Sequence, residues 1–225
     1  MRTPWLVLGL AACCVFAGTP AIAADSSTAL TQKALITRKL SIDLRDVPFQ
    51  EALEMLTSQV GVALALDGHI TAKTLRQPLT LRLRKSSVYA VLHWVFRKHQ
   101  LGWAVDGREI TVAPPERIDA GIRNEQMAFV ARTEQRWRKE MAPRLNETRM
   151  SLDVADVPLA DTIDLVAERA GLNVVWESDA ESRRRQRVSL KLADVPVREI
   201  LDQLTASAGL VWSLEGEAAL ISTKE

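Results

Sequence analysis

A long internal repeat constrains the fold of this chain more than any other feature of its sequence. The segment LSIDLRDVP at 40–48 recurs as MSLDVADVP at 150–158, at an offset of 110. The match continues without a gap to Gly61 against Gly171, and later segments match at an offset of 109, with Trp103 against Trp212. Self-similarity of this length predicts two copies of one small domain.

Each copy contains a second, shorter level of repetition. In the second copy, LDVADVP at 152–158 recurs as LKLADVP at 190–196, and AGL at 170–172 recurs at 208–210. The first copy shows its halves more weakly, because Ser86 and Ser87 stand where Val-Pro would be. The sequence therefore indicates about four versions of one unit.

The repeated unit has the pattern of a strand, a helix and a strand. Apolar residues alternate with charged ones over 42–45, which is the period of a half-buried strand. After Pro48, apolar residues follow at helical spacing as far as Val60, and Gly61 stands where a left-handed residue ends a helix. Two units give a βαββαβ domain with a tight turn at Asp106-Gly107. The predicted fold class is α+β, with two tandem domains that each have two helices on one face of a small sheet.

The repeat and the composition divide the chain into five segments. Residues 1–23 have the features of a cleaved signal peptide, namely Arg2, an apolar run at 6–16 and a small-residue cleavage site at 21–23. The alternative is lipidation at Cys13, which lies in a lipobox-like LAAC sequence. We expect a flexible leader at 24–39, the first domain at 40–113, a helical linker at 114–149 and the second domain at 150–225.

The linker differs in composition from both copies. It begins with Pro114-Pro115 and then becomes rich in charged residues, Gln and Ala. This predicts a charged helix from about 121 to 141 that ends near Pro143. The helix is expected to act as a solvated spacer, and the alternative is that it packs on one domain.

Composition excludes several classes of function. The chain has 29 basic and 28 acidic residues, so no global positive field draws it to nucleic acid or to an anionic membrane. Both cysteines, Cys13 and Cys14, leave with the signal peptide, so no disulfide or thiolate chemistry remains. The apolar run at 6–16 is too short to span a bilayer, so no transmembrane segment is expected in the mature chain.

No group of residues has the spacing of a catalytic or metal site. His69, His93 and His99 all belong to the first copy and have no partner at a ligand spacing, so structural or surface roles are expected. The recurring Asp46 and Asp156 are interpreted as polar groups at the start of a helix. We expect no enzyme activity and no cofactor.

The one pronounced charge feature is the arginine run before the third strand of the second copy. It comprises Arg183, Arg184, Arg185 and Arg187, and Arg76 stands at the matching place in the first copy. A solvated loop is the default interpretation. The functional interpretation is contact with an acidic partner or with lipid or lipopolysaccharide phosphates, whereas nucleic acid is disfavoured because no aromatic platform accompanies the charges.

Residues 41–56, Gly61 and the later Leu81-Arg82-Leu83 resemble the secretin and TonB N-terminus short domain. The second copy fits through 151–158, Gly171-Leu172 and 188–196. The resemblance covers both copies and includes neither a secretin channel region nor an outer-membrane barrel. It therefore implies a protein-docking module of the bacterial envelope and does not imply pore formation.

The expected function is that of a periplasmic protein-protein interaction module, an accessory component of a secretin-type secretion or type IV pilus system. Its expected partners are secretin, pilus or TonB-system proteins, and it is expected in the periplasm, with outer-membrane association as an option. One alternative is a signalling adaptor between a TonB-dependent transducer and an anti-sigma regulator. Another is a periplasmic binder of peptidoglycan or a small molecule. The expected docking mechanism is strand addition to an open sheet edge or docking of an edge on a sheet face.

Overall fold

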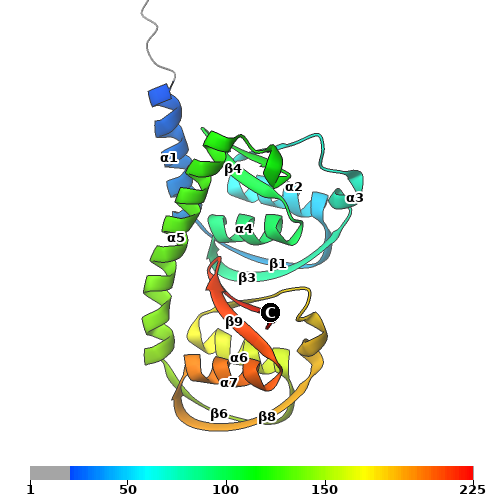
Figure 1. The fold of residues 1–225 in the computed structure, drawn as a ribbon, viewed down its shortest axis with the longest axis vertical. Helices are drawn as coiled ribbons and strands as arrows, with labels where there is room; N and C mark the ends of the chain where they lie inside the picture. The colour runs from blue at the N-terminus through cyan, green and yellow to red at the C-terminus, as the bar shows by residue number, and fades with distance from the viewer. Residues whose placement is uncertain (1–20, 225) are drawn as a thin grey trace, which may run out of the picture.

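The computed structural model describes residues 21–224, and side chains from Ser27 onward (Figure 1). The predicted signal peptide at 1–23 and the alternative anchor Cys13 therefore lie outside the described residues, apart from the backbone of 21–23. Within the described part of the chain, no helix is long and apolar enough to cross a membrane.

The two copies have the same order of secondary structure. The elements of the first copy are β1 Lys39–Pro48, α2 Phe49–Val60, β2 Ala63–Leu66, α3 Ala72–Leu75, β3 Pro78–Ser87, α4 Val88–Lys98, β4 Gly102–Asp106 and β5 Glu109–Ala113. The elements of the second copy are β6 Arg149–Pro158, α6 Leu159–Ala170, β7 Asn173–Trp176, the 3₁₀ helix η2 Glu181–Arg185, β8 Arg187–Pro196, α7 Val197–Ser207, β9 Leu210–Glu215 and β10 Ala218–Thr223. The α+β class and the tandem arrangement are confirmed.

The strands of each copy form two sheets, where the sequence predicted one. In the first copy, β1 and β3 make an antiparallel ribbon, while β5 lies between a parallel β2 and an antiparallel β4. The second copy repeats this with β6–β8 and with β7-β10-β9. The helices α2 and α4 lie between the ribbon and the three-stranded sheet (Figure 1). Helix α4 contacts strands of both sheets, namely β1, β3 and β4, so one sheet with two helices on a single face was the wrong arrangement.

Each ribbon strand contains a bulge at a residue with positive φ, and this corrects the interpretation of Asp46 and Asp156. The helices begin after Pro48 and Pro158 without a side-chain cap, so neither aspartate caps a helix. Each bulge residue instead donates its backbone N–H to a hydroxyl of the opposite strand: Asp46 to Thr80 (3.1 Å), Lys85 to Ser41 (2.9 Å), Asp156 to Ser189 (3.0 Å) and Asp194 to Ser151 (3.0 Å). The four bulges match the four units seen in the sequence.

The segment expected to be a flexible leader is helical. Helix α1 covers Ala21–Thr37, and its Leu35 is buried in the core of the first copy. Thr28 accepts a hydrogen bond from the backbone N–H of Gly107 (2.9 Å), and Thr31 donates one to the carbonyl of Gly107 (2.8 Å). These contacts fix the helix to the turn between β4 and β5, so the prediction of flexibility was wrong.

The linker helix is longer than predicted. After the short 3₁₀ helix η1 (Pro115–Arg117), α5 runs from Ala120 to Glu147 and continues through Pro143. Its last turns bury Met141 and Leu145 in the core of the second copy, which offsets the cost of the internal proline. Leu145 stands 110 residues after Leu35, so the end of α5 is the structural counterpart of α1.

Candidate functional site

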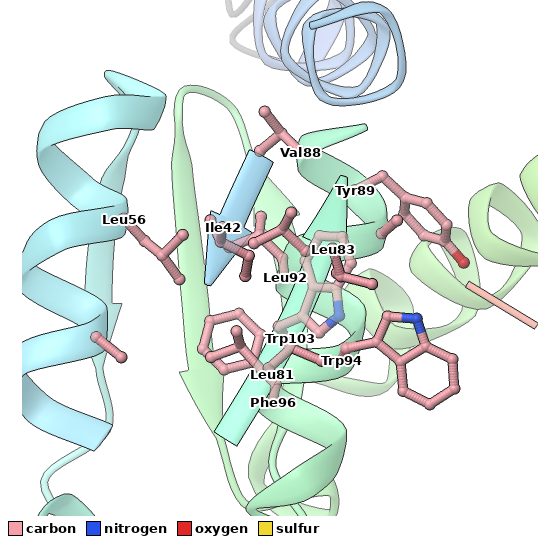
Figure 2. Close-up of a cluster of buried hydrophobic side chains, with 14 of the residues drawn as sticks. Ile42, Leu56, Leu81, Leu83, Val88, Tyr89, Leu92, Trp94, Phe96 and Trp103 are labelled. Atoms are coloured by element: carbon pink, nitrogen blue, oxygen red, sulfur yellow. The ribbon is translucent and has the colours of Figure 1, made fainter. Parts of the chain in front are cut away.

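The two copies meet at an extensive joint with an apolar centre. Helix α4 is buried almost all round, through Val88, Tyr89, Ala90, Val91, Leu92, Trp94, Val95 and Phe96. The hydrophobic cluster that contains these residues also includes Val175, Ala218 and Leu220 from the sheet of the second copy. Figure 2 shows Tyr89 and Trp94 together at one margin of this cluster. The joint was not predicted, although the run VYAVLHWVF, which is apolar on nearly every side, carries its signal.

The rim of the joint pairs basic side chains of the first copy with acidic side chains of the second. Arg97 contacts both Glu177 (Nη2 to Oε1, 2.8 Å) and Glu215 (Nη1 to Oε1, 2.7 Å). His93 Nε2 lies 3.1 Å from Glu215 Oε1, and this hydrogen bond holds the pKa of the Glu215 carboxyl below its ordinary value. Further pairs are Lys39 with Glu217 (3.0 Å) and Arg84 with Glu168. The joint is therefore electrostatically complementary as well as apolar.

Glu134 of α5 connects both copies from a buried position. Its carboxylate accepts hydrogen bonds from the Tyr89 hydroxyl of α4 (2.8 Å) and from the backbone N–H of Gly216 in the second copy (3.0 and 3.2 Å). The Trp94 indole N–H donates to the Gly216 carbonyl (2.8 Å). Burial and the neighbouring Glu134 raise the pKa of the Tyr89 hydroxyl, so Tyr89 stays a donor. Both backbone groups of Gly216 are thus held from outside its own copy.

One sheet edge of the second copy is covered by the ribbon of the first. The Asn173 side chain on β7 accepts from the backbone N–H of Arg84 (2.7 Å) and donates to the Arg84 carbonyl (3.1 Å). The Asn173 amide thereby bonds to both backbone groups of Arg84, as the backbone of a neighbouring strand would. At the other end of β7, Lys98 Nζ donates to the carbonyl of Trp176 (3.2 Å). The joint therefore includes side-chain contacts to backbone groups at a sheet edge, without strand pairing between the copies.

A cleft of about 830 Å³ lies beside the joint, between the β1–β3 ribbon and the elements α5, α6, β7 and η2. Eight basic and six acidic residues line it, so it has no field of a single sign. Burial lowers the pKa of Lys98 and raises the pKa of Asp164, which both line the cleft. The mixed lining favours a ligand or segment that itself carries both charges.

The structure does not bring the predicted arginines together in one site. Arg184 lines the cleft, where it stacks over Trp176 (5.4 Å from the ring centre) and pairs with Glu181 (3.2 Å). Arg187 pairs across its ribbon with Asp156. The remaining three, Arg183, Arg185 and Arg76, are exposed, and no hydrogen bond or ion pair of their side chains is found among the described residues. A partner contact at these arginines stays a prediction.

The three histidines have separate surroundings. His69 hydrogen-bonds Asp67 on the surface, and His93 belongs to the joint. His99 is buried against the ring of Phe49, and burial lowers its pKa to about 4. Among residues 21–224, no group of three or more potential ligands has a geometry that could hold a metal ion.

Comparison with known proteins gives structural similarities but no family. No family model matches the chain, and no curated protein matches it. Among solved structures, the chain is similar to XcpQN012, the N-terminal part of the secretin XcpQ, over 75% of this chain and 97% of that one. The identity is 14% and the TM-score is 0.29, so this similarity carries no functional argument.

Proposed function

We propose that the chain is a non-enzymatic protein-protein interaction module of the bacterial periplasm. In this proposal it serves as an accessory or docking component of a secretin-type secretion or type IV pilus system. The resemblance of both copies to the secretin and TonB N-terminus short domain supports the choice of system. The proposal concerns docking and includes no channel or transport activity.

The observation that carries the proposal is the joint between the two copies. One copy presents a buried helix, a ribbon edge and a set of basic side chains to the sheet and acidic side chains of the next. An apolar centre with a polar, complementary rim is the anatomy of a specific protein interface. A domain of this type therefore has surfaces suited to binding another folded domain.

The test is co-purification of the full chain from its native envelope. A tagged chain is expressed with its own leader, cross-linked in living cells, and its partners are identified by mass spectrometry. Enrichment of a secretin or pilus component over a tag-only control is expected, together with recovery of the chain in the periplasmic fraction. Enrichment of an inner-membrane anti-sigma regulator would move the chain to the signalling class. Absence of any enriched envelope protein would contradict docking altogether.

A ligand-binding function is the second candidate, and the cleft is the observation that favours it. Its volume of about 830 Å³ lies within the range of about 300–1,000 Å³ typical of small-molecule sites. A bound ligand would raise the melting temperature of the chain in a concentration-dependent way. Peptidoglycan fragments, which combine ammonium and carboxylate groups, are the first probes to use because the lining is mixed.

A further inference from the structure

The β2 edge of the first copy is the counterpart of an edge that is covered in the second copy. Strand β2 corresponds to β7 at an offset of 110, with Leu66 at the place of Trp176. Lys98 of the first copy covers the outward carbonyl of Trp176, whose side chain is 5% exposed in the core of the second copy, whereas Leu66 is 43% exposed and its outward carbonyl has no such contact among the described residues. The same position in the fold is therefore covered in one copy and open in the other.

The backbone of β2 offers unused hydrogen-bonding groups at this edge. The N–H of Asp67 donates to Val112 of β5 (2.9 Å), so the alternate residues Leu64 and Leu66 direct their N–H and C=O groups away from β5. In the second copy, the matching carbonyl of Trp176 points outward in the same way, to Lys98. Among the described residues, no hydrogen bond outside the ladder with β5 involves the backbone of Leu64 or Leu66.

Apart from being short, the β2 edge lacks the features that normally protect an edge strand from pairing. Its sequence is Ala-Leu-Ala-Leu, without charge, proline or bulge. The β6–β8 ribbon, in contrast, has ion pairs across its exposed face, including Arg149 with Asp194 (3.1 Å) and Lys191 with Asp153 (3.0 Å). Of these two exposed elements, β2 is the one suited to accept a strand.

We infer that β2 is a docking edge for an extended, apolar segment of a partner protein, which adds to the β2-β5-β4 sheet as a fourth strand. This inference rests on the proposed docking function and names the surface and the class of partner segment. Main-chain bonds to Leu64 and Leu66 would hold the segment, and an apolar side chain would cover Leu66.

The size of the edge favours a short segment over a second copy of this chain. A strand of four residues is about 13 Å long. A stable interface between two folded proteins uses about 800 Å² on each side, which is far more than one short edge supplies. Charge also disfavours an association of two chains through the surfaces that form the internal joint. The second copy has Ala193 and Ala206 at the positions of Arg84 and Arg97, so it lacks the basic side chains that pair with acidic ones in the joint.

The experiment uses the full chain with a photoreactive amino acid at position 63, on the β2 edge, or at position 165. Leu165 is the matched control, because it is 39% exposed and lies on α6 of the other copy. Two variants test the edge. Leu66→Pro removes one outward N–H, which an edge strand tolerates, and Leu66→Asp places a charge on the apolar surface. Thermal unfolding of each variant verifies that it is folded.

We expect an adduct from position 63 to an extended segment of an envelope protein and none from position 165. Leu66→Pro should reduce the yield by about tenfold, the factor that corresponds to one lost hydrogen bond, and Leu66→Asp should reduce it because a charge would be buried against the apolar segment. Adducts only to another copy of this chain, equal yields from both positions, or yields unaffected by the Leu66 variants would overturn the inference. If partners still co-purify while the β2 edge gives no adduct, docking holds and only the choice of edge fails.

Discussion

Replacing Glu134 by alanine removes the one side chain that bonds both copies from α5. Glu134 is 8% exposed, and the substitution leaves the Tyr89 hydroxyl and the Gly216 N–H without their acceptor. A hydrogen bond to a charged group contributes about 1.5–3 kcal/mol. The ion pair with the half-exposed Arg138, at 3.7 Å, adds little. We therefore expect the free energy of unfolding to fall by about 3–5 kcal/mol.

Urea unfolding followed by tryptophan fluorescence measures this effect, because Trp94 also bonds to Gly216. Glu134→Gln keeps an acceptor oxygen and should cost about 1–2 kcal/mol. Glu140→Ala, on the exposed side of the same helix, is the control and should stay within about 0.5 kcal/mol of the wild type. If Glu134→Ala destabilises the chain no more than Glu140→Ala does, the role of Glu134 in the joint is refuted.

Three further predictions follow from buried positions. Gly216→Ala would place a Cβ 2.6 Å from the Trp94 indole nitrogen, so it should destabilise the chain by more than Gly171→Ala, where φ is also positive but the space is open. Equal losses in urea unfolding would contradict the packing of the joint. His99 has a pKa lowered to about 4 by burial, so between pH 6.5 and 4 the unfolded chain binds a proton that the folded chain excludes. Stability should therefore fall by about 3 kcal/mol over that window, and a His99→Phe variant with the same pH profile would refute this cause. Leu145→Ala should cost about 2–5 kcal/mol because this side chain of α5 is fully buried; a loss below about 1 kcal/mol would show that the end of α5 does not pack on the second copy.

The parts of the fold that depend on local sequence could be predicted. The strand and helix periods placed the core elements of both copies, and Gly61 and Gly171 end their helices in the left-handed conformation as expected (φ 68° and 65°). These features depend on a few adjacent residues, and the repeat provides each signal twice. The sequence pattern therefore sufficed for them.

The parts that depend on distant partners were missed. The positive φ of Asp156 is supported by the hydroxyl of Ser189 on another strand, which no local pattern shows. Likewise, α1 is held through its Leu35 in the core and through two of its threonines, which bond to Gly107 on a distant turn. The counterpart of α1 in α5 shares little sequence with it. The division of each copy into a ribbon and a three-stranded sheet is also a choice among distant pairings.

The candidate site could be predicted only in part. Arg184 lines the cleft, whereas Arg183, Arg185 and Arg76 are dispersed over the exposed surface, and a partner contact at these arginines stays a prediction. The joint was overlooked because its acidic members, Glu177 and Glu215, are far apart in the sequence and meet only through Arg97. One signal of the joint was present in the sequence. Helix α4 is apolar on nearly every side, whereas its counterpart α7 has charged residues on its outer face.

The most direct test of the account is to cross-link the full, tagged chain in its native envelope and quantify the proteins attached to it. We expect enrichment of a secretin or pilus component, and a loss of that enrichment when Leu66→Asp blocks the β2 edge. Recovery of the chain without any envelope protein, under conditions in which it is folded, would contradict the docking function on which the account depends.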